Sequence, residues 1–262
     1  EISLGLVGSE MCIRDRLMDD WHDQGATSLD AAPAHLRDAL CLVLDVDDLV
    51  AARRTAAALA PWFGTVKVGL ELFSAAGPDA VTIFVEAGFR VFCDLKLHDI
   101  PNTVGSAARV LGSSGARWVT VHTSGGEAML RAAVDSMAEG AAGVGAEAPG
   151  VLGVTVLTSD ETAGRSILEQ RCELAVVTGC AGIVCAAPDL PVTDPWADRL
   201  VRVVPGIRMP GGDAHDQARV ASPRDALAAG ADLLVVGRAV TAARDPQVAA
   251  AELVAHLAGD RS

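Results

Sequence analysis

Eight short runs rich in Val, Leu and Ile recur along the chain from residue 40 onward, and segments of helical length separate most of them. Short apolar runs of this kind are typical of buried strands, and their alternation with helices is typical of repeated parallel βα units. The expected strands are residues 41–45, 66–69, 91–95, 118–122, 150–156, 182–185, 201–204 and 233–236. They predict a single-domain α/β protein, a (β/α)8 TIM barrel, whose active site would lie at the C-terminal ends of the strands.

The segments between these strands predict helices, with only a short connection after the sixth strand. The expected helices are residues 48–60, 77–87, 103–114, 126–139, 161–179, 222–229 and 245–257. Gly88, Gly115, Gly140 and Gly230 each follow a helical stretch, where glycine is typical of a left-handed cap. The alternative is a doubly wound open sheet, but the chain has neither G-x-G-x-x-G after the first strand nor G-x-x-x-x-G-K-[ST] anywhere. The barrel is therefore favoured.

The N-terminal region follows none of these patterns. Residues 1–16, EISLGLVGSEMCIRDR, are interpreted as a non-native leader, because their apolar part is too short for a signal-peptide core and follows an acidic residue. Residues 17–37 are interpreted as an N-terminal lead-in, and residues 38–262 as the barrel domain.

The composition argues against several classes of partner. The 262 residues carry a formal net charge of −13, and no cluster of Lys and Arg is present to bind a phosphate backbone. No uncharged stretch reaches the roughly 18 apolar residues that a membrane-spanning helix needs. The six cysteines form no C-x-x-C pair, which indicates free buried thiols in a reducing compartment. We therefore expect a soluble, cytoplasmic protein without nucleic-acid or membrane partners and without a metal site.

Lysine is rare in this chain. Of 21 basic residues only Lys67 and Lys96 are lysines, and the rest are arginines. A lysine retained in such a chain indicates a position that needs a compact ammonium with transferable protons, although chance survival would give the same count.

Charged residues are expected to converge at one mouth of the barrel. Residues two apart in a strand face the same way, so Phe92, Asp94 and Lys96 should all face inward. Asp45 ends the first strand and Lys67 lies in the second. Alternating carboxylates and ammoniums would keep one another charged. The structural alternative is an ion-pair network that only stabilises the barrel rim, but such a network could use arginine.

The third strand continues into D-L-K-L-H-D-I-P-N-T at residues 94–103. This segment resembles the orotidine 5′-phosphate decarboxylase family, whereas D-x-K-x-x-D alone is shared with related barrels that decarboxylate or condense sugar phosphates. The resemblance extends over nearly the whole chain from about residue 38. It includes L-D-V-D at 44–47, V-K-V-G at 66–69, V-H-T-S-G-G at 121–126, V-T-V-L-T-S at 154–159, P-G-I-R at 205–208, G-D-A-H-D-Q at 212–217 and V-V-G-R at 235–238.

The resemblance implies conversion of orotidine 5′-phosphate to UMP and CO₂, the last step of de novo UMP synthesis, without a metal or an organic cofactor. It implies that Lys96 protonates C6 of the pyrimidine and that Asp94 lies against the substrate carboxylate. A cationic acid suits this step because it stabilises the nascent carbanion and then supplies the proton. Lys67 is expected to bridge the carboxylates and touch the ribose, and Asp45 to bind a ribose hydroxyl.

The resemblance also implies a homodimer with shared sites. Asp99 and Thr103 are expected to reach into the neighbouring subunit's site, and Asp99 to help keep Lys96 charged. The alternative for both residues is a local role at the start of their own helix.

The remaining site residues are expected around the phosphate and the base. Gly237 and Arg238 follow the eighth strand, where barrels commonly bind phosphate. Gln217 should meet the phosphate when the Gly- and Pro-rich loop 205–217 closes. Arg208 is assigned to substrate binding through its P-G-I-R motif, and Thr158, with Ser159 as the alternative, to the pyrimidine edge.

Two histidines and two other functions offer alternatives to this interpretation. His122 and His98 lack a second His or suitable Cys at ligand spacing and are interpreted as structural. One alternative function is a magnesium-dependent sugar-phosphate decarboxylase or synthase of the same barrel group. Another is a non-catalytic phosphate-binding protein, which would be expected to lose Lys96 or a carboxylate of the array.

Overall fold

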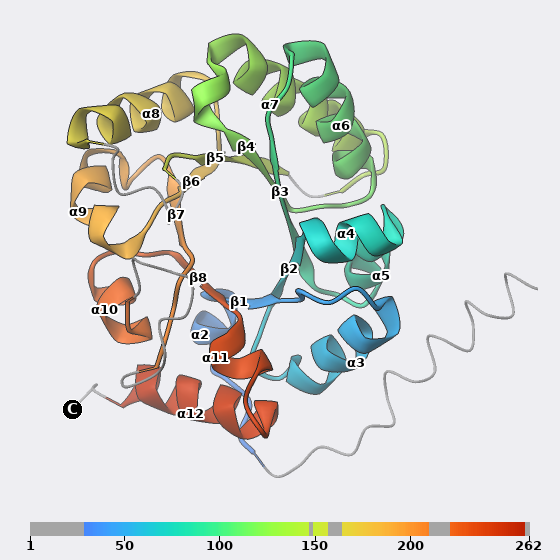
Figure 1. Cartoon of the computed structure of the whole chain (residues 1–262), viewed down its shortest axis with the longest axis vertical. Coiled ribbons are helices and arrows are strands. Elements are labelled where there is room, and N and C mark those ends of the chain that lie inside the picture. Colours follow the sequence, from blue (N-terminus) through green and yellow to red (C-terminus); the bar gives the residue numbers. More distant parts are fainter. Residues whose placement is uncertain (1–28, 147–148, 157–163, 210–220, 260–262) are drawn as a thin grey trace, which may run out of the picture. The chain divides into compact units, whose positions relative to one another are not determined.

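Residues 29–146, 149–156, 164–209 and 221–259 are described by the computed structural model, and from Ala31 onward the chain forms one compact unit. Its centre is a closed barrel of eight parallel strands in sequence order (Figure 1). The strands are β1 (Leu40–Val43), β2 (Thr65–Gly69), β3 (Arg90–Leu97), β4 (Trp118–His122), β5 (Gly150–Val154), β6 (Gly182–Val184), β7 (Val201–Val204) and β8 (Leu233–Val236). The predicted (β/α)8 barrel is therefore confirmed.

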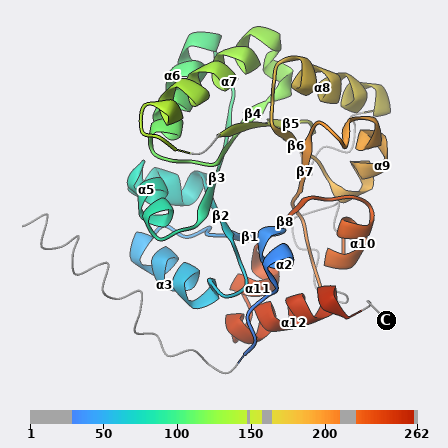
Figure 2. The same cartoon turned by 180° about the vertical axis from the view of Figure 1, so that it is seen from behind.

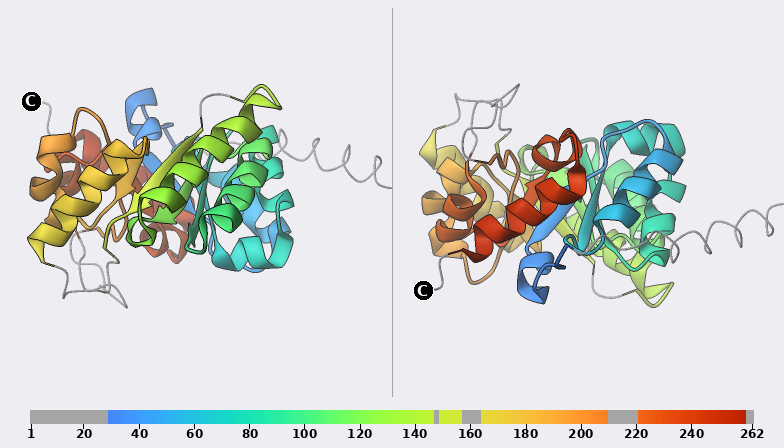
Figure 3. Two further views of the ribbon diagram at one scale, coloured as in Figure 1. Left: turned by 90° about the horizontal axis from the view of Figure 1, so that it is seen from above. Right: turned by 90° about the horizontal axis from the view of Figure 1, so that it is seen from below.

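Helices surround the barrel on its outer side (Figures 1 and 2). They are α2 (Ala34–Asp38), α3 (Leu49–Leu59), α4 (Leu70–Ala76), α5 (Asp79–Glu86), α6 (Pro101–Ser113), α7 (Glu127–Ala142), α8 (Arg165–Val177), α9 (Leu190–Thr193), α10 (Pro223–Ala228), α11 (Arg238–Thr241) and α12 (Pro246–Ala258). Three short 3₁₀ helices, η1 (Thr123–Gly125), η2 (Ala187–Asp189) and η3 (Asp194–Trp196), complete the set within the described ranges. Figure 3 shows α2 and α11 at opposite ends of the barrel, because α2 directly precedes the start of β1 and α11 directly follows the end of β8.

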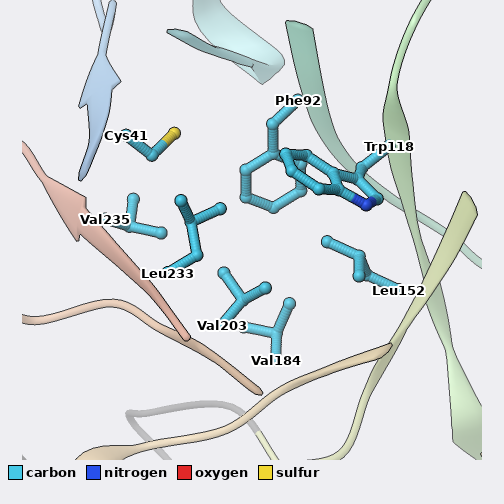
Figure 4. Close-up of a cluster of buried hydrophobic side chains, with 8 residues drawn as sticks. All are labelled: Cys41, Phe92, Trp118, Leu152, Val184, Val203, Leu233 and Val235. Atoms are coloured by element: carbon cyan, nitrogen blue, oxygen red, sulfur yellow. The ribbon is translucent and has the colours of Figure 1, made fainter. Parts of the chain in front are cut away.

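The barrel interior is filled by a layer of apolar side chains rather than by a channel. One inward-facing cluster draws on every strand except β2 (Figure 4): Cys41, Phe92, Trp118, Leu152, Val184, Val203, Leu233 and Val235. Phe92 is two residues before Asp94 on the same strand, so this layer forms an apolar floor beneath the C-terminal mouth.

Helices α6 and α7 pack closely because glycine is present at their contact (Figure 1). A Cβ at Gly140 would lie 2.1 Å from the backbone oxygen of Arg109, and one at Gly112 would lie 2.3 Å from that of Met137. Neither approach is possible for a residue with a side chain. The expectation that Gly140 caps a helix was therefore wrong, because Gly140 lies inside α7 and serves the packing of the two helices.

Several element boundaries differ from those expected. β1 ends at Val43, so Asp45 lies just beyond the strand, and the described β5 ends at Val154. The expected helix 77–87 begins at Asp79, after the separate helix α4, which the sequence analysis missed. Positive φ angles at Gly88, Gly115 and Gly230 confirm those three caps.

The sequence also led to expectations about the N-terminal region, the cysteines and membrane-spanning helices. The leader assigned to residues 1–16 and the first part of the lead-in lie outside the described residues. Of the six cysteines, Cys12 also lies outside them, and the other five are buried and free. No helix in the described ranges is long and apolar enough to span a membrane.

Candidate active site

A cavity of about 500 Å³ opens at the C-terminal ends of the strands. One side, which we call the charged wall, consists of Asp45 from the loop after β1, Lys67 from β2, and Asp94 and Lys96 from β3. The facing residues of β5, β6 and the segments that follow them, which we call the apolar wall, are Val154, Val156, Val184 and Cys185. A volume of this size is typical of a site for a small ligand.

The four side chains of the charged wall form one chain of ion pairs. Lys67 Nζ lies 3.2 Å from Asp45 Oδ1 and 3.5 Å from Asp94 Oδ2. Lys96 Nζ donates a hydrogen bond of 2.7 Å to Asp94 Oδ1. The predicted convergence of these charges at one mouth is therefore confirmed, with Asp94 between the two lysines, although Asp45 comes from the loop after β1 and not from the strand itself.

Burial and charge act in opposite directions on this array. Burial by itself would lower the pKa of Lys67, but the carboxylates of Asp94 and Asp45 more than offset it and raise that pKa above its ordinary value. Burial would likewise raise the pKa of Asp94, yet the charges of Lys67 and Lys96 and hydrogen bonds from Lys96 and Thr120 lower it. Lys67 and Asp94 therefore keep each other charged.

A local irregularity in β3 delivers Lys96 to the cavity. The pairing with β4 shifts between Cys93 and Leu97, and Lys96 adopts a φ of 49°, which is rare for a residue other than glycine. The left-handed conformation costs on the order of 1–2 kcal/mol. The backbone N–H of Lys96 is held by a 2.8 Å hydrogen bond to the buried hydroxyl of Thr120, a residue that the sequence analysis did not identify.

Gly69 leaves room for the array. A Cβ on this residue would lie 2.8 Å from Lys67 Nζ and 2.9 Å from Asp45 Oδ1. The glycine of the V-K-V-G motif therefore has a steric role, which its place in the motif alone did not reveal.

The β7 and β8 side of the same cavity supplies cations. Arg208, Gly237 and Arg238 all line it, with Arg208 only 8% exposed and Arg238 at the first position of α11. The guanidinium of Arg208 donates a 2.9 Å hydrogen bond to the backbone oxygen of Ile207. Two guanidinium groups and a side-chain-free backbone at one edge can bind a phosphate.

Two expected site residues do not line this cavity, and two more lie outside the described residues. Asp99 and Thr103 are exposed at the start of α6 and do not line it, and an oxygen of Asp99 accepts the N–H of Ile100 at 2.7 Å. Thr158, together with its alternative Ser159, and Gln217 lie outside the described residues.

The two histidines lie beside one another near the mouth. The ring centroids of His98 and His122 are 5.4 Å apart, and neither residue lines the cavity. Burial lowers the pKa of His122, helped by the neighbouring His98 and by the positive charges of Lys96 and Arg171, so the neutral form of His122 is favoured. Within the described ranges, no three His, Cys, Asp or Glu side chains are grouped so that they could hold a metal ion.

The fold and the cavity together define a (β/α)8-barrel enzyme with its charged residues at the C-terminal ends of the strands. The family model described as orotidine 5′-phosphate decarboxylase / HUMPS matches residues 38–253. The chain belongs to this family.

Curated relatives and solved structures agree with the family match. An orotidine 5′-phosphate decarboxylase of Moorella thermoacetica is 42% identical over 235 residues, which cover 85% of this chain and 93% of the relative. One of Anaeromyxobacter dehalogenans is 45% identical over 229 residues, covering 83% and 97%. The crystal structure of orotidine 5′-phosphate decarboxylase from Lactobacillus acidophilus has a TM-score of 0.71 at 30% identity and covers 83% of this chain and 98% of its own.

Proposed function

We propose that this protein decarboxylates orotidine 5′-phosphate to UMP and CO₂, the last step of de novo UMP synthesis. The observation that carries the proposal is the array of ion pairs among Asp45, Lys67, Asp94 and Lys96, in a cavity that Arg208 and Arg238 also line. The two curated relatives named above are called orotidine 5′-phosphate decarboxylases, and this chain matches most of their length.

The chemical step needs a cation that also supplies a proton. As the bond from C6 to the carboxylate carbon breaks, CO₂ leaves and its bonding electron pair stays on C6. Lys96 Nζ donates a proton to that pair, and the resulting amine takes up a proton again from solvent. Asp94, 2.7 Å from Lys96 Nζ, orients the ammonium and lies against the substrate carboxylate.

The other residues of the charged wall bind the sugar. Lys67 lies between Asp45 and Asp94, so its ammonium can neutralise both carboxylates and reach the ribose. Asp45, with 55% of its side chain exposed, has room to accept a hydrogen bond from a ribose hydroxyl.

The phosphate belongs at the edge formed by the segments after β7 and β8. Arg238 and the backbone at Gly237 would grip it, with Gln217 closing from its loop and Arg208 contributing from the end of β7. Phosphate carries two negative charges near neutral pH, and a guanidinium can bind it through two parallel hydrogen bonds. Thr158, or Ser159 in its place, would bind the edge of the pyrimidine.

The active unit is a homodimer in this proposal. Asp99 and Thr103 would enter the partner subunit's site and bring a third carboxylate near its lysine. Their exposure supports this role, as does the neighbouring Ile100, which is 65% exposed although it is apolar.

The proposed location, partners and domain bounds of the enzyme follow from the same family. The enzyme would work in the cytoplasm on a small phosphorylated substrate, with no nucleic-acid partner and no cofactor, and its five buried free thiols fit a reducing compartment. The barrel domain would span residues 38–262, in line with a family match that begins at residue 38, and residues 1–16 would be a non-native leader.

The test is the ultraviolet absorbance change of orotidine 5′-phosphate with purified protein in EDTA, beside the Lys96→Ala variant. We expect rapid substrate loss with the parent protein. In the variant kcat should decrease by at least about 10²–10⁴-fold, which is the usual contribution of a positioned general acid to the rate. Arg199→Ala, on an exposed side chain next to η3, is the matched control and should keep parental activity. A folded parent protein with no turnover in EDTA, but activity on a sugar phosphate with magnesium, would instead establish the related barrel chemistry.

A further inference from the structure

The pairing of β3 with β4 is interrupted where the charged wall begins. Cys93 pairs with Val119 and Leu97 pairs with Val121, so four steps along β3 correspond to two steps along β4. Thr120 is therefore the single β4 residue opposite the irregular stretch that carries Asp94 and Lys96.

The hydroxyl of Thr120 contacts both of those residues. It accepts a 2.8 Å hydrogen bond from the backbone N–H of Lys96 and lies 3.2 Å from Asp94 Oδ1. The backbone oxygen of Cys93 is farther away, at 3.5 Å. A hydroxyl has one proton to donate, and the nearer, ionised oxygen of Asp94 is the stronger acceptor.

These two bonds act on the two features that make the site unusual. The first holds the amide of Lys96 while its backbone stays at a φ of 49°. The second fixes the oxygen of Asp94 that also receives Lys96 Nζ at 2.7 Å, which leaves the other oxygen to face Lys67 at 3.5 Å. One hydroxyl thus fixes both the backbone and the partner carboxylate of Lys96.

Thr120 itself is rigid and shielded. Its side chain is fully buried and does not line the cavity, so it would not touch the substrate. As a β-branched residue in a strand it has few rotamers, which limits where its hydroxyl can point.

We infer that Thr120 is a positioning residue for the decarboxylation, because its hydroxyl locks Lys96 and Asp94 into their relative geometry. The inference rests on the proposed function. It predicts that a loss of this hydroxyl affects the chemical step and leaves ligand binding nearly unchanged.

The variants Thr120→Val and Thr120→Ser separate the hydroxyl from the shape of the side chain. Thr120→Val should lower kcat by about 10- to 100-fold, the scale of a misplacement near 1 Å. Its KM for orotidine 5′-phosphate and its dissociation constant for UMP should stay within about threefold of the parent values, because no binding group is removed. Thr120→Ser keeps the hydroxyl and should restore kcat to within about threefold.

Thr123→Val is the matched control. Thr123 is also buried, at the start of η1 directly after β4, and within the described ranges its hydroxyl donates to the backbone oxygen of Val154, at 2.8 Å. A general effect of losing a buried hydroxyl would lower kcat in both variants. The inference predicts the decrease only in Thr120→Val.

Crystal structures of the parent protein and Thr120→Val provide a readout that does not depend on turnover. We expect the variant to lose the positive φ at Lys96 or the short contact between Lys96 and Asp94. Unchanged geometry at both places, or equal kcat values of parent and variant, would overturn the inference, as would a Thr120→Ser variant as slow as Thr120→Val. A parent protein without decarboxylase activity would contradict the proposed function instead, and the two structures would still decide the role of Thr120 in the geometry. If Thr120→Val does not fold, Thr120→Ala gives the same comparison with a smaller side chain.

Discussion

The charged wall and the apolar wall of the cavity differ in almost every physical respect. The charged wall links two carboxylates and two ammoniums through ion pairs, whereas the apolar wall presents three valines and a buried thiol. Charges interact more strongly next to a surface that excludes water. The difference indicates a division of labour in which one wall performs the chemistry and the other strengthens it without taking part.

Asp99 and Thr103 do not line the cavity of their own chain, and the proposed homodimer would bring them to the charged wall of the partner subunit. Lys96→Ala and Asp99→Ala proteins should each be inactive alone. When they are mixed, half of the dimers are mixed dimers and each has one intact site, so activity should recover to about a quarter of the parent value. Steady-state rates of the mixture measure the recovery. No recovery after mass spectrometry has demonstrated subunit exchange would refute shared sites.

Arg238 contrasts with the charged wall, since it is expected to bind and not to react. Arg238→Ala should raise KM for orotidine 5′-phosphate by about 10- to 100-fold, the cost of losing hydrogen bonds to a charged group. A smaller decrease in kcat is expected if phosphate binding drives loop closure. Steady-state kinetics of the variant, with and without added inorganic phosphite or phosphate, would check that Arg238 binds the substrate phosphate. A KM equal to that of the parent would place the phosphate elsewhere.

Asp94 allows a comparison of the charged wall with an ordinary surface ion pair. Asp94→Asn should lower the free energy of unfolding at pH 7 by about 3 kcal/mol, because it leaves Lys67 buried beside a neutral group. The folded-state pKa of Asp94 is lowered, so its stabilising effect is present above the ordinary value of 3.8 and is lost as the pH falls through the folded-state pKa.

Urea denaturation of parent and variant between pH 7 and pH 2 measures this effect, and the difference between them should shrink below pH 3.8. Asp38→Asn is the control, since Asp38 pairs with Arg90 at 2.9 Å with 63% of its side chain exposed. That exposed pair should contribute under about 1 kcal/mol at every pH. Equal losses in the two variants would show that burial does not strengthen the charged wall.

The apolar wall should give the smallest effect. Val156→Ala removes two methyl groups from a residue that is 6% exposed, which corresponds to at most about a 15-fold increase in KM. The value of kcat should hardly change, because no charge is moved. Val144→Ala, on a residue that is 57% exposed after α7, should change neither constant. A large decrease in kcat for Val156→Ala would show that the apolar wall takes part in the chemical step.

The barrel could be predicted from the sequence because its strands are short, apolar and regularly spaced. Helices were harder to predict, since α4 has only seven residues between Gly69 and Gly77, which is too few for a helical period to be recognised. Gly140 was mistaken for a cap because a glycine that permits close packing and a glycine that ends a helix look the same in sequence.

The charged wall could be predicted from the period of two along β3 and from the scarcity of lysine. Strict alternation, however, did not anticipate the irregularity that places Lys96 at a positive φ. Thr120 was missed for the same reason, because its role depends on a register shift between two strands. Such a shift is set by packing across the barrel and leaves no mark in either segment alone.

The close packing of α6 against α7 has a consequence for mutational tolerance. Gly112 and Gly140 lie on the outer layer of the barrel, where substitutions are usually accepted, yet each meets a backbone atom of the facing helix. Because α6 begins at Pro101, four residues after β3 ends at Leu97, any side chain that pushed it outward would pull on the strand that bears Asp94 and Lys96. A survey of random variants should therefore find that these two peripheral positions are as intolerant of change as the residues around the cavity.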